Sequence, residues 1–112
     1  MSAIDEYRAF QGTAGFKLFA GIARLNKLDA KEVFFAVRDE VLDAIDGLMR
    51  GVRYRSNDLL TDELWAIFVT PGLHKAIGIC VSFLVKLGVV PLVCVSTVHE
   101  SCKWYSLKPL TN

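Results

Sequence analysis

The sequence predicts a mostly α-helical domain that ends in a C-terminal β-hairpin. Apolar residues recur at helical spacing through most of the first 48 residues, and the apolar tract that begins at Ala76 is interrupted by Gly88 and Pro91. The residues after that interruption are rich in β-branched types, which favour strands. The chain has 112 residues, enough for one hydrophobic core. We therefore expect residues 1–112 to form a single domain with an N-terminal helical part over 1–50.

Two helices are expected in the first 25 residues. Ser2 is followed three residues later by Asp5, an arrangement similar to a capping box, and predicts a short helix through Phe10. A second helix is expected over about Thr13–Leu25, although Gly21 lowers its helix preference. The predicted inward face of this second helix comprises Phe16, Phe19, Ala20 and Ala23.

A third helix is expected from Asp29 to about Leu48, with Asp29 and Glu32 at its start and Gly47 or Gly51 at its end. Its predicted inward stripe comprises Val33, Phe34, Val37, Val41, Ala44, Ile45 and Leu48. The opposite side carries Arg38, Asp39, Asp43 and Asp46, and its excess of acids makes this face of the helix unsuited to contact DNA. We interpret these carboxylates as solvated rather than catalytic, and we expect no enzyme activity and no catalytic residue.

The second half begins with a polar, basic hinge over Gly51–Asp58. Asn57 or Asp58 is expected to cap a helix over about Leu59–Val69, and Pro71-Gly72 should end it. A further helix is expected over Leu73–Leu87, closed by Gly88. Its predicted core-facing residues are Ile77, Cys80, Val81 and Leu84.

A hairpin is expected after Pro91, with one strand over Leu92–Val98, a turn over Val98–Cys102 and a returning strand over Lys103–Lys108. Tyr105 and Leu107 should share its inward face.

The alternative is a membrane span, because Ala76–Val95 has twenty residues and only one charge. That charge, Lys86, lies mid-segment, where it costs roughly 2.5–3.5 kcal/mol on insertion scales. We therefore expect a buried helix followed by a strand, and no membrane partner.

Charge and cysteine content place few constraints on partners. The net charge is +1, although the first 49 residues carry a small acidic excess and the remainder a small basic one. The three cysteines have no CxxC spacing, so we expect no disulfide, with Cys80 and Cys94 buried in a reducing, cytoplasmic compartment. His99 and Cys102, even with Cys94 or His74, lack the usual spacing of a structural zinc site. No nucleotide-binding fingerprint occurs either, so no metal and no cofactor are expected.

The predicted order of helix, Pro-Gly turn, helix and hairpin resembles the winged helix-turn-helix family. The resemblance covers residues 60–107. It includes Leu84-Val85-Lys86-Leu87-Gly88-Val89-Val90 at the end of the second helix and Trp104-Tyr105-Ser106-Leu107 in the returning strand. It implies that two or three N-terminal helices precede a winged-helix part over 57–108.

The resemblance also implies a small DNA-binding transcription regulator that contacts double-stranded DNA through helix 73–87 and the wing 92–108. Two subunits are expected to pair, because a dimer contacts two half-sites. The expected DNA contacts on the helix are His74, Lys75, Gly78, Ser82 and Lys86. Those on the wing are His99, Ser101 and Lys103, and those in the hinge are Arg50, Arg53 and Arg55.

The alternative is a winged-helix protein-interaction module without DNA binding, such as an adaptor or inhibitor, possibly encoded by a mobile genetic element. The outward face of helix 73–87 lacks the Arg, Asn or Gln side chains that usually contact bases. Ile79, Phe83 and Val85 make the same helix unusually apolar, which suits a protein partner or a second copy of the chain.

Overall fold

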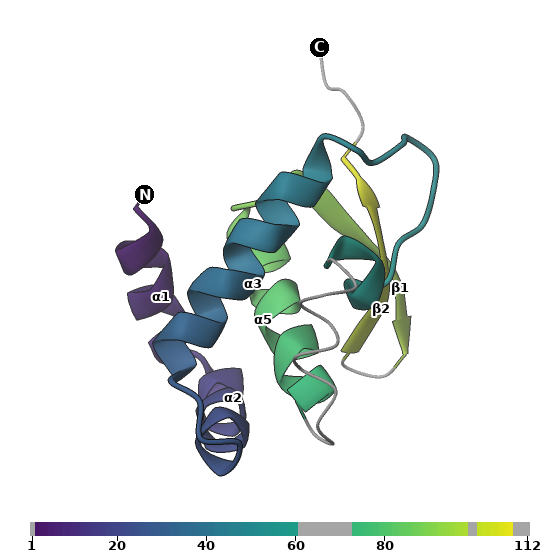
Figure 1. Cartoon of the computed structure of the whole chain (residues 1–112). Coiled ribbons are helices and arrows are strands. Elements are labelled where there is room, and N and C mark those ends of the chain that lie inside the picture. Colours follow the sequence, from purple (N-terminus) through teal and green to yellow (C-terminus); the bar gives the residue numbers. More distant parts are fainter. Residues whose placement is uncertain (1, 61–72, 99–100, 109–112) are drawn as a thin grey trace.

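A computed structural model describes residues 2–60, 73–98 and 101–108 and contains helices followed by an antiparallel hairpin (Figure 1). This confirms the predicted fold class of a mostly α-helical chain with a C-terminal β-hairpin. The helices are α1 (Ala3–Gln11), α2 (Ala14–Leu25), α3 (Ala30–Ile45), the 3-10 helix η1 (Ser56–Leu59) and α5 (Leu73–Leu87). The strands are β1 (Leu92–Val98) and β2 (Ser101–Leu107).

Side-chain caps begin α1 and α3, as the sequence predicts. The Asp5 amide donates to Ser2 Oγ at 3.3 Å, while the Ser2 hydroxyl donates to Asp5 Oδ2 at 2.8 Å. The hydrogen bond from the Ser2 hydroxyl is the main reason that the pKa of the Asp5 carboxyl lies below its ordinary value. At α3, Asp29 Oδ1 accepts from the Lys31 amide at 2.8 Å. Each cap satisfies an amide that the first turn of a helix leaves without a partner.

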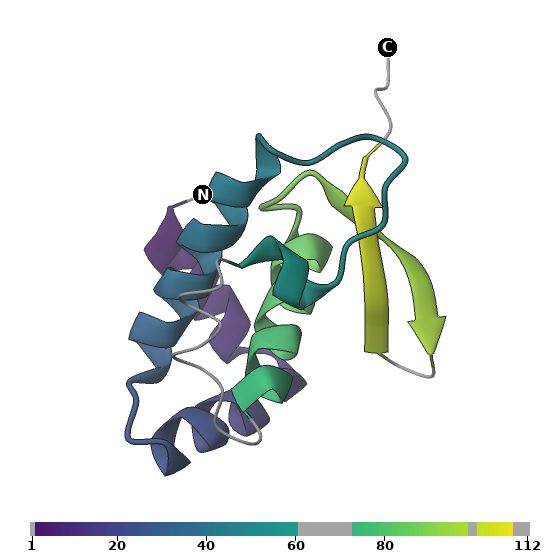
Figure 2. The same ribbon diagram turned by 45° about the vertical axis from the view of Figure 1, so that its right-hand side comes forward.

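Helix α5 lies at the centre of the molecule, with α1, α2 and α3 on one side and the hairpin on the other (Figures 1 and 2). The four residues predicted to face the core, Ile77, Cys80, Val81 and Leu84, have no exposed surface. Tyr7 and Phe10 from α1, Phe34 from α3 and Tyr105 from β2 belong to the same buried cluster. One core therefore draws on both halves of the chain.

The apolar tract that begins at Ala76 forms two elements, as predicted. Helix α5 ends at Leu87, and Gly88 adopts a positive φ of 84°, a conformation that favours glycine. The Val89 amide donates to Leu84 O at 3.1 Å, which closes the helix before β1 begins. None of the helices in the described ranges is long and apolar enough to cross a membrane.

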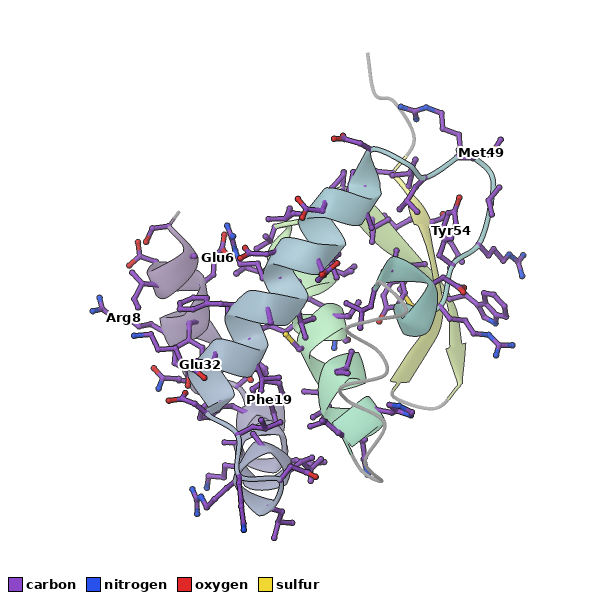
Figure 3. All side chains as sticks on the ribbon, in the orientation of Figure 1. Glu6, Arg8, Phe19, Glu32, Met49 and Tyr54 are labelled. Carbon is purple, nitrogen blue, oxygen red and sulfur yellow. The ribbon has the colours of Figure 1, made fainter. Side chains whose placement is uncertain are left out.

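The hinge folds back onto the hairpin, which the sequence did not predict. Tyr54 pairs with Tyr105 of β2 through two backbone hydrogen bonds of 2.7 and 2.8 Å. The Tyr54 hydroxyl also accepts from the Met49 amide at 2.8 Å, so the segment forms a closed loop (Figure 3). Residues 49–54 are thereby held beside the outer edge of β2.

The helix predicted from Leu59 does not begin there. Asp58 Oδ2 accepts from the Arg55 amide at 2.9 Å, so Asp58 lies within the 3-10 helix η1 and caps its start, rather than capping a helix that begins at Leu59. Leu60 is extended, with φ −116° and ψ 151°. The remainder of that predicted helix and the Pro71-Gly72 stop lie outside the described residues.

The returning strand is longer than predicted. It begins at Ser101 rather than Lys103 and ends at Leu107, so the predicted turn over Val98–Cys102 is too wide. The register pairs Leu92 with Leu107 and Cys94 with Tyr105, with an irregularity after Cys94. Tyr105 is buried and Leu107 is partly buried against the core, as expected.

The cysteine predictions are only partly confirmed. Cys80 is a buried free thiol, and burial raises its pKa. Cys94, in contrast, is exposed and disulfide-bonded, so the predictions that it is buried and that no disulfide forms are wrong. An apolar run in a strand indicates burial only where both faces of the sheet are covered. Val95 is likewise exposed, so this end of the hairpin leaves apolar positions facing solvent.

A buried ion pair ties α1 to α3. Glu6 is only 4% exposed, and its Oε2 accepts a hydrogen bond from Nε of Arg38. Figure 3 shows Glu6 on the side of α1 that faces α3. The bond to Glu6 is the main reason that the pKa of the Arg38 guanidinium is raised. Asp39, Asp43 and Asp46 on the outer side of α3 are exposed, as predicted.

Candidate functional site

The outward side of α5 lines a groove with a volume of about 610 Å³. Helix α5 contributes Lys75, Gly78, Ile79, Ser82, Phe83 and Lys86. The corner between α1 and α2 contributes Phe10, Thr13, Gly15 and Leu18. Four of the five residues predicted to contact DNA from this helix are therefore in the groove wall, and we call this feature the α2–α5 groove.

Close packing of α2 on α5 forms the back of the groove. A Cβ atom on Gly15 would lie 3.0 Å from Cγ2 of Ile79, so glycine at this position allows the two helices to approach closely. The ring centroids of Phe10 and Phe83 are 4.8 Å apart. Ile79 and Phe83 are therefore partly buried contacts to the N-terminal helices, which explains why this side of α5 is unusually apolar.

The floor of the groove is open at Gly78. A Cβ atom there would meet nothing within 4 Å. Ser82 lies one helical turn further on and is also small. Small side chains therefore leave space along the middle of α5. Leu18 on the opposite wall is 45% exposed. The groove thus has apolar walls and space for an inserted group.

The charged residues of the groove are basic. Lys75 and Lys86 are exposed and lie eleven positions apart on α5. Helices α2 and α5 contain no acidic residue, and α2 adds Lys17 and Arg24. Among the described residues, the ion pairs are those of Arg8 with Asp5 and of Arg38 with Glu6 and Asp39. No acid therefore neutralises the two groove lysines within that part of the chain.

The hinge arginines form a second surface together with the hairpin. The Arg55 guanidinium lies 4.5 Å from the ring centre of Trp104, a cation–π contact. Arg50 donates from Nη1 to the Lys108 carbonyl at 3.3 Å. Arg53 lies between Arg50 and Arg55 in the sequence and directly precedes Tyr54 of the Tyr54–Tyr105 bridge. Its side chain is exposed. We call Arg50, Arg53, Arg55, Trp104 and Lys108 the hinge–hairpin surface.

The predicted DNA-contacting residues are therefore divided between two surfaces. The α2–α5 groove lies on the side of α5 that faces α1 and α2, and the hinge–hairpin surface lies across α5 from it (Figures 1 and 2). His74 is exposed on the first turn of α5 but does not line the groove. His99 lies outside the described residues, and for Ser101 and Lys103 the structure describes only the backbone of β2.

Sequence reasoning missed the α1–α2 side of the groove. A pattern that could have indicated it is the pair Leu18 and Leu25, which lie seven positions apart on α2, outside the predicted inward stripe. Leu25 is 85% exposed. Two outward leucines on a helix with a basic outer face indicate a surface available to a partner.

No protein-family model, curated protein or solved structure matches this chain. Function is therefore argued from the two surfaces alone.

Proposed function

We propose that this chain is a protein-interaction module whose α2–α5 groove receives a segment of a partner protein. The observation that supports this proposal most strongly is the packing of α2 against the outward side of α5. In the winged-helix resemblance, that side of α5 is the one expected to contact DNA. Here its apolar residues contact α1 and α2, and its small residues line a groove.

The dimensions of DNA support the same choice. An α-helix with its side chains is about 10–12 Å across, close to the roughly 12 Å width of the major groove. A helix that enters the groove therefore needs its outer side clear of neighbours. Helix α2 adjoins α5 at Ile79, beside Lys75 and Ser82, so base contacts from this side require α2 to move.

The winged-helix architecture itself remains part of the proposal. Within the part of residues 60–107 that the structure describes, helix α5 is followed by the hairpin, in the order that the resemblance implies. Most of the first helix of the motif and the Pro-Gly turn lie outside the described residues. An adaptor or inhibitor built on this architecture would use the face that a DNA-binding relative uses for bases.

The proposal is tested by fluorescence anisotropy with a random duplex of about 20 base pairs, roughly two turns of DNA, at low salt. We expect Lys75→Glu and Gly78→Leu to leave any duplex binding unchanged. Arg53→Glu serves as the comparison, because it alters the other surface. Loss of duplex binding in both groove variants, with Arg53→Glu unaffected, would contradict the proposal.

A second candidate function, DNA contact through phosphates, is favoured by the hinge–hairpin surface. The Tyr54–Tyr105 bridge places the arginine-containing hinge beside the hairpin, and Arg53 and Arg55 are exposed there. In this proposal the chain is a transcription regulator that pairs two subunits. Three arginine–phosphate contacts would give a slope of about −2.7 in log affinity against log salt concentration. Arg53→Gln should reduce the slope by about one unit.

A further inference from the structure

We infer that the occupant of the α2–α5 groove is an acidic, amphipathic helix of about three turns supplied by a partner protein. This inference rests on the proposed function and specifies the chemistry of the partner. It follows from three properties of the groove: its charge, its length and the shape of its floor.

The charge of the groove selects an acidic partner. Lys75 and Lys86 line the groove, and α2 and α5, which contribute most of its lining, carry no acid. Lys17 and Arg24 add further positive charge on α2. Carboxylates of a docked segment would meet Lys75 and Lys86, whereas a basic segment would face like charges on the α5 wall.

The length and floor of the groove fit a helix. Eleven positions separate Lys75 from Lys86, a distance of about 16 Å along α5, or three helical turns. Gly78 leaves open space at the floor, and Ser82 follows one turn later. Small residues let a second helix approach within the usual interaxial distance of about 8–10 Å. Apolar side chains of the docked helix would then contact Leu18, Ile79 and Phe83.

A second copy of this chain fits the groove less well than a foreign helix does. A two-fold interface joins the same patch on both subunits, so Lys75 and Lys86 would lie opposite the cationic wall of the other copy. The acidic outer side of α3 has the complementary charge, but Asp39, Asp43 and Asp46 offer no apolar row to fill the walls. A partner that combines carboxylates with apolar anchors satisfies both requirements.

The test is selection from a displayed library of roughly 16-residue helical peptides, about four turns each. Leucines are fixed along one face, and the flanking positions are randomised among Glu, Gln and Lys. Selection is made against the intact chain and against Gly78→Leu, which fills the floor. Gly47→Leu is the steric control, because a Cβ there makes only ordinary contact at 3.7 Å and the residue lies outside the groove. Melting curves establish that each variant is folded.

We expect enrichment of Glu at the flanking positions. Binding of the selected peptides should weaken at least about tenfold in Gly78→Leu and stay unchanged in Gly47→Leu. The double variant Lys75→Glu/Lys86→Glu should shift the selection toward Lys. The double variant Lys27→Glu/Lys31→Glu, with the same net charge change at two exposed residues outside the groove, should not.

Four results would overturn the inference. Enrichment of Gln or Lys, or no enrichment at all, excludes an acidic helix. Binding that survives Gly78→Leu places the peptide elsewhere. Dimerisation by ultracentrifugation that Gly78→Leu abolishes identifies a second copy as the occupant, and this outcome leaves the proposed function intact. If instead a random duplex displaces the peptide and Gly78→Leu also abolishes duplex binding, the proposed function fails as well.

Discussion

At the scale of single residues, three helical glycines differ in what surrounds them. Gly21 of α2 and Gly78 of α5 face open space, whereas Gly15 lies against Ile79. Glycine in the middle of a helix costs about 1 kcal/mol relative to alanine, unless packing requires it. The contact between α2 and α5 therefore requires glycine at position 15, whereas no contact requires it at Gly21 or Gly78.

The three alanine variants should reflect this difference. Gly21→Ala and Gly78→Ala should each raise the free energy of unfolding by about 0.5–1 kcal/mol, because only helix propensity changes. Gly15→Ala should gain less or lose stability, because its Cβ would lie 3.0 Å from Ile79. Urea titrations followed by circular dichroism measure all three. Equal gains at all three positions would show that α2 and α5 are not in close contact at Gly15.

Cys80 predicts a dependence of stability on alkaline pH. Burial raises the pKa of this thiol in the folded chain, so the unfolded chain releases the proton first. The stabilisation is complete below the unfolded thiol pKa of about 8.5 and declines as the pH rises above it, by at most about 1.4 kcal/mol per pH unit. Urea titrations between pH 7 and 10 should show this decline, and Cys80→Ala should flatten it. An equally steep decline in Cys80→Ala would assign the effect to another group.

Periodicity predicted the buried residues of α5 well, because the inward stripe of that helix faces a single core. It did not predict Glu6, whose burial depends on an arginine 32 positions away, or the exposure of Cys94. The sequence near Glu6 does not indicate what covers it, and the sequence near Cys94 does not indicate that it is left exposed. Contacts between distant segments decide both cases.

At the scale of elements, the Glu6–Arg38 pair determines how firmly α1 is attached to α3. Glu6→Ala leaves a largely buried guanidinium without its main partner, which should cost about 2–3 kcal/mol. Asp39→Asn removes the exposed partner of the same arginine, which lies 3.2 Å away, and should cost less than about 0.5 kcal/mol. Thermal melts compare the two variants. A cost for Asp39→Asn as large as that for Glu6→Ala would contradict this assignment.

Elements whose ends are marked by glycine or proline were predicted best. Leu73–Leu87 and Leu92–Val98 have the predicted bounds, since Gly88 and Pro91 divide the tract. The prediction for the hinge missed its pairing with the hairpin, because Tyr105, the backbone partner of Tyr54, lies 51 positions further along the chain. Asp58 has the residue type of a helix cap but caps η1 instead. Residue type indicates that a residue caps a helix, but it does not indicate whether that helix precedes or follows the residue in the sequence.

At the scale of the whole molecule, the two candidate surfaces lie on different sides of α5. The sequence predicted the α5 side chains of the groove but grouped them with the hinge arginines as one DNA site. That grouping assumed that the outward side of α5 is exposed to solvent. Packing of α2 over this side separates the residues into an apolar groove with lysines at its rim and an arginine-containing surface beside the hairpin.

This separation is tested most directly by amide NMR of the labelled chain during titration with a random DNA duplex at low salt. If the account is right, any chemical-shift changes fall on Arg53, Arg55 and Trp104, while the amides of Gly78 and Ser82 stay in place. Large shifts at Gly78 and Ser82, with the hinge unmoved, would show that the outward side of α5 contacts DNA after all.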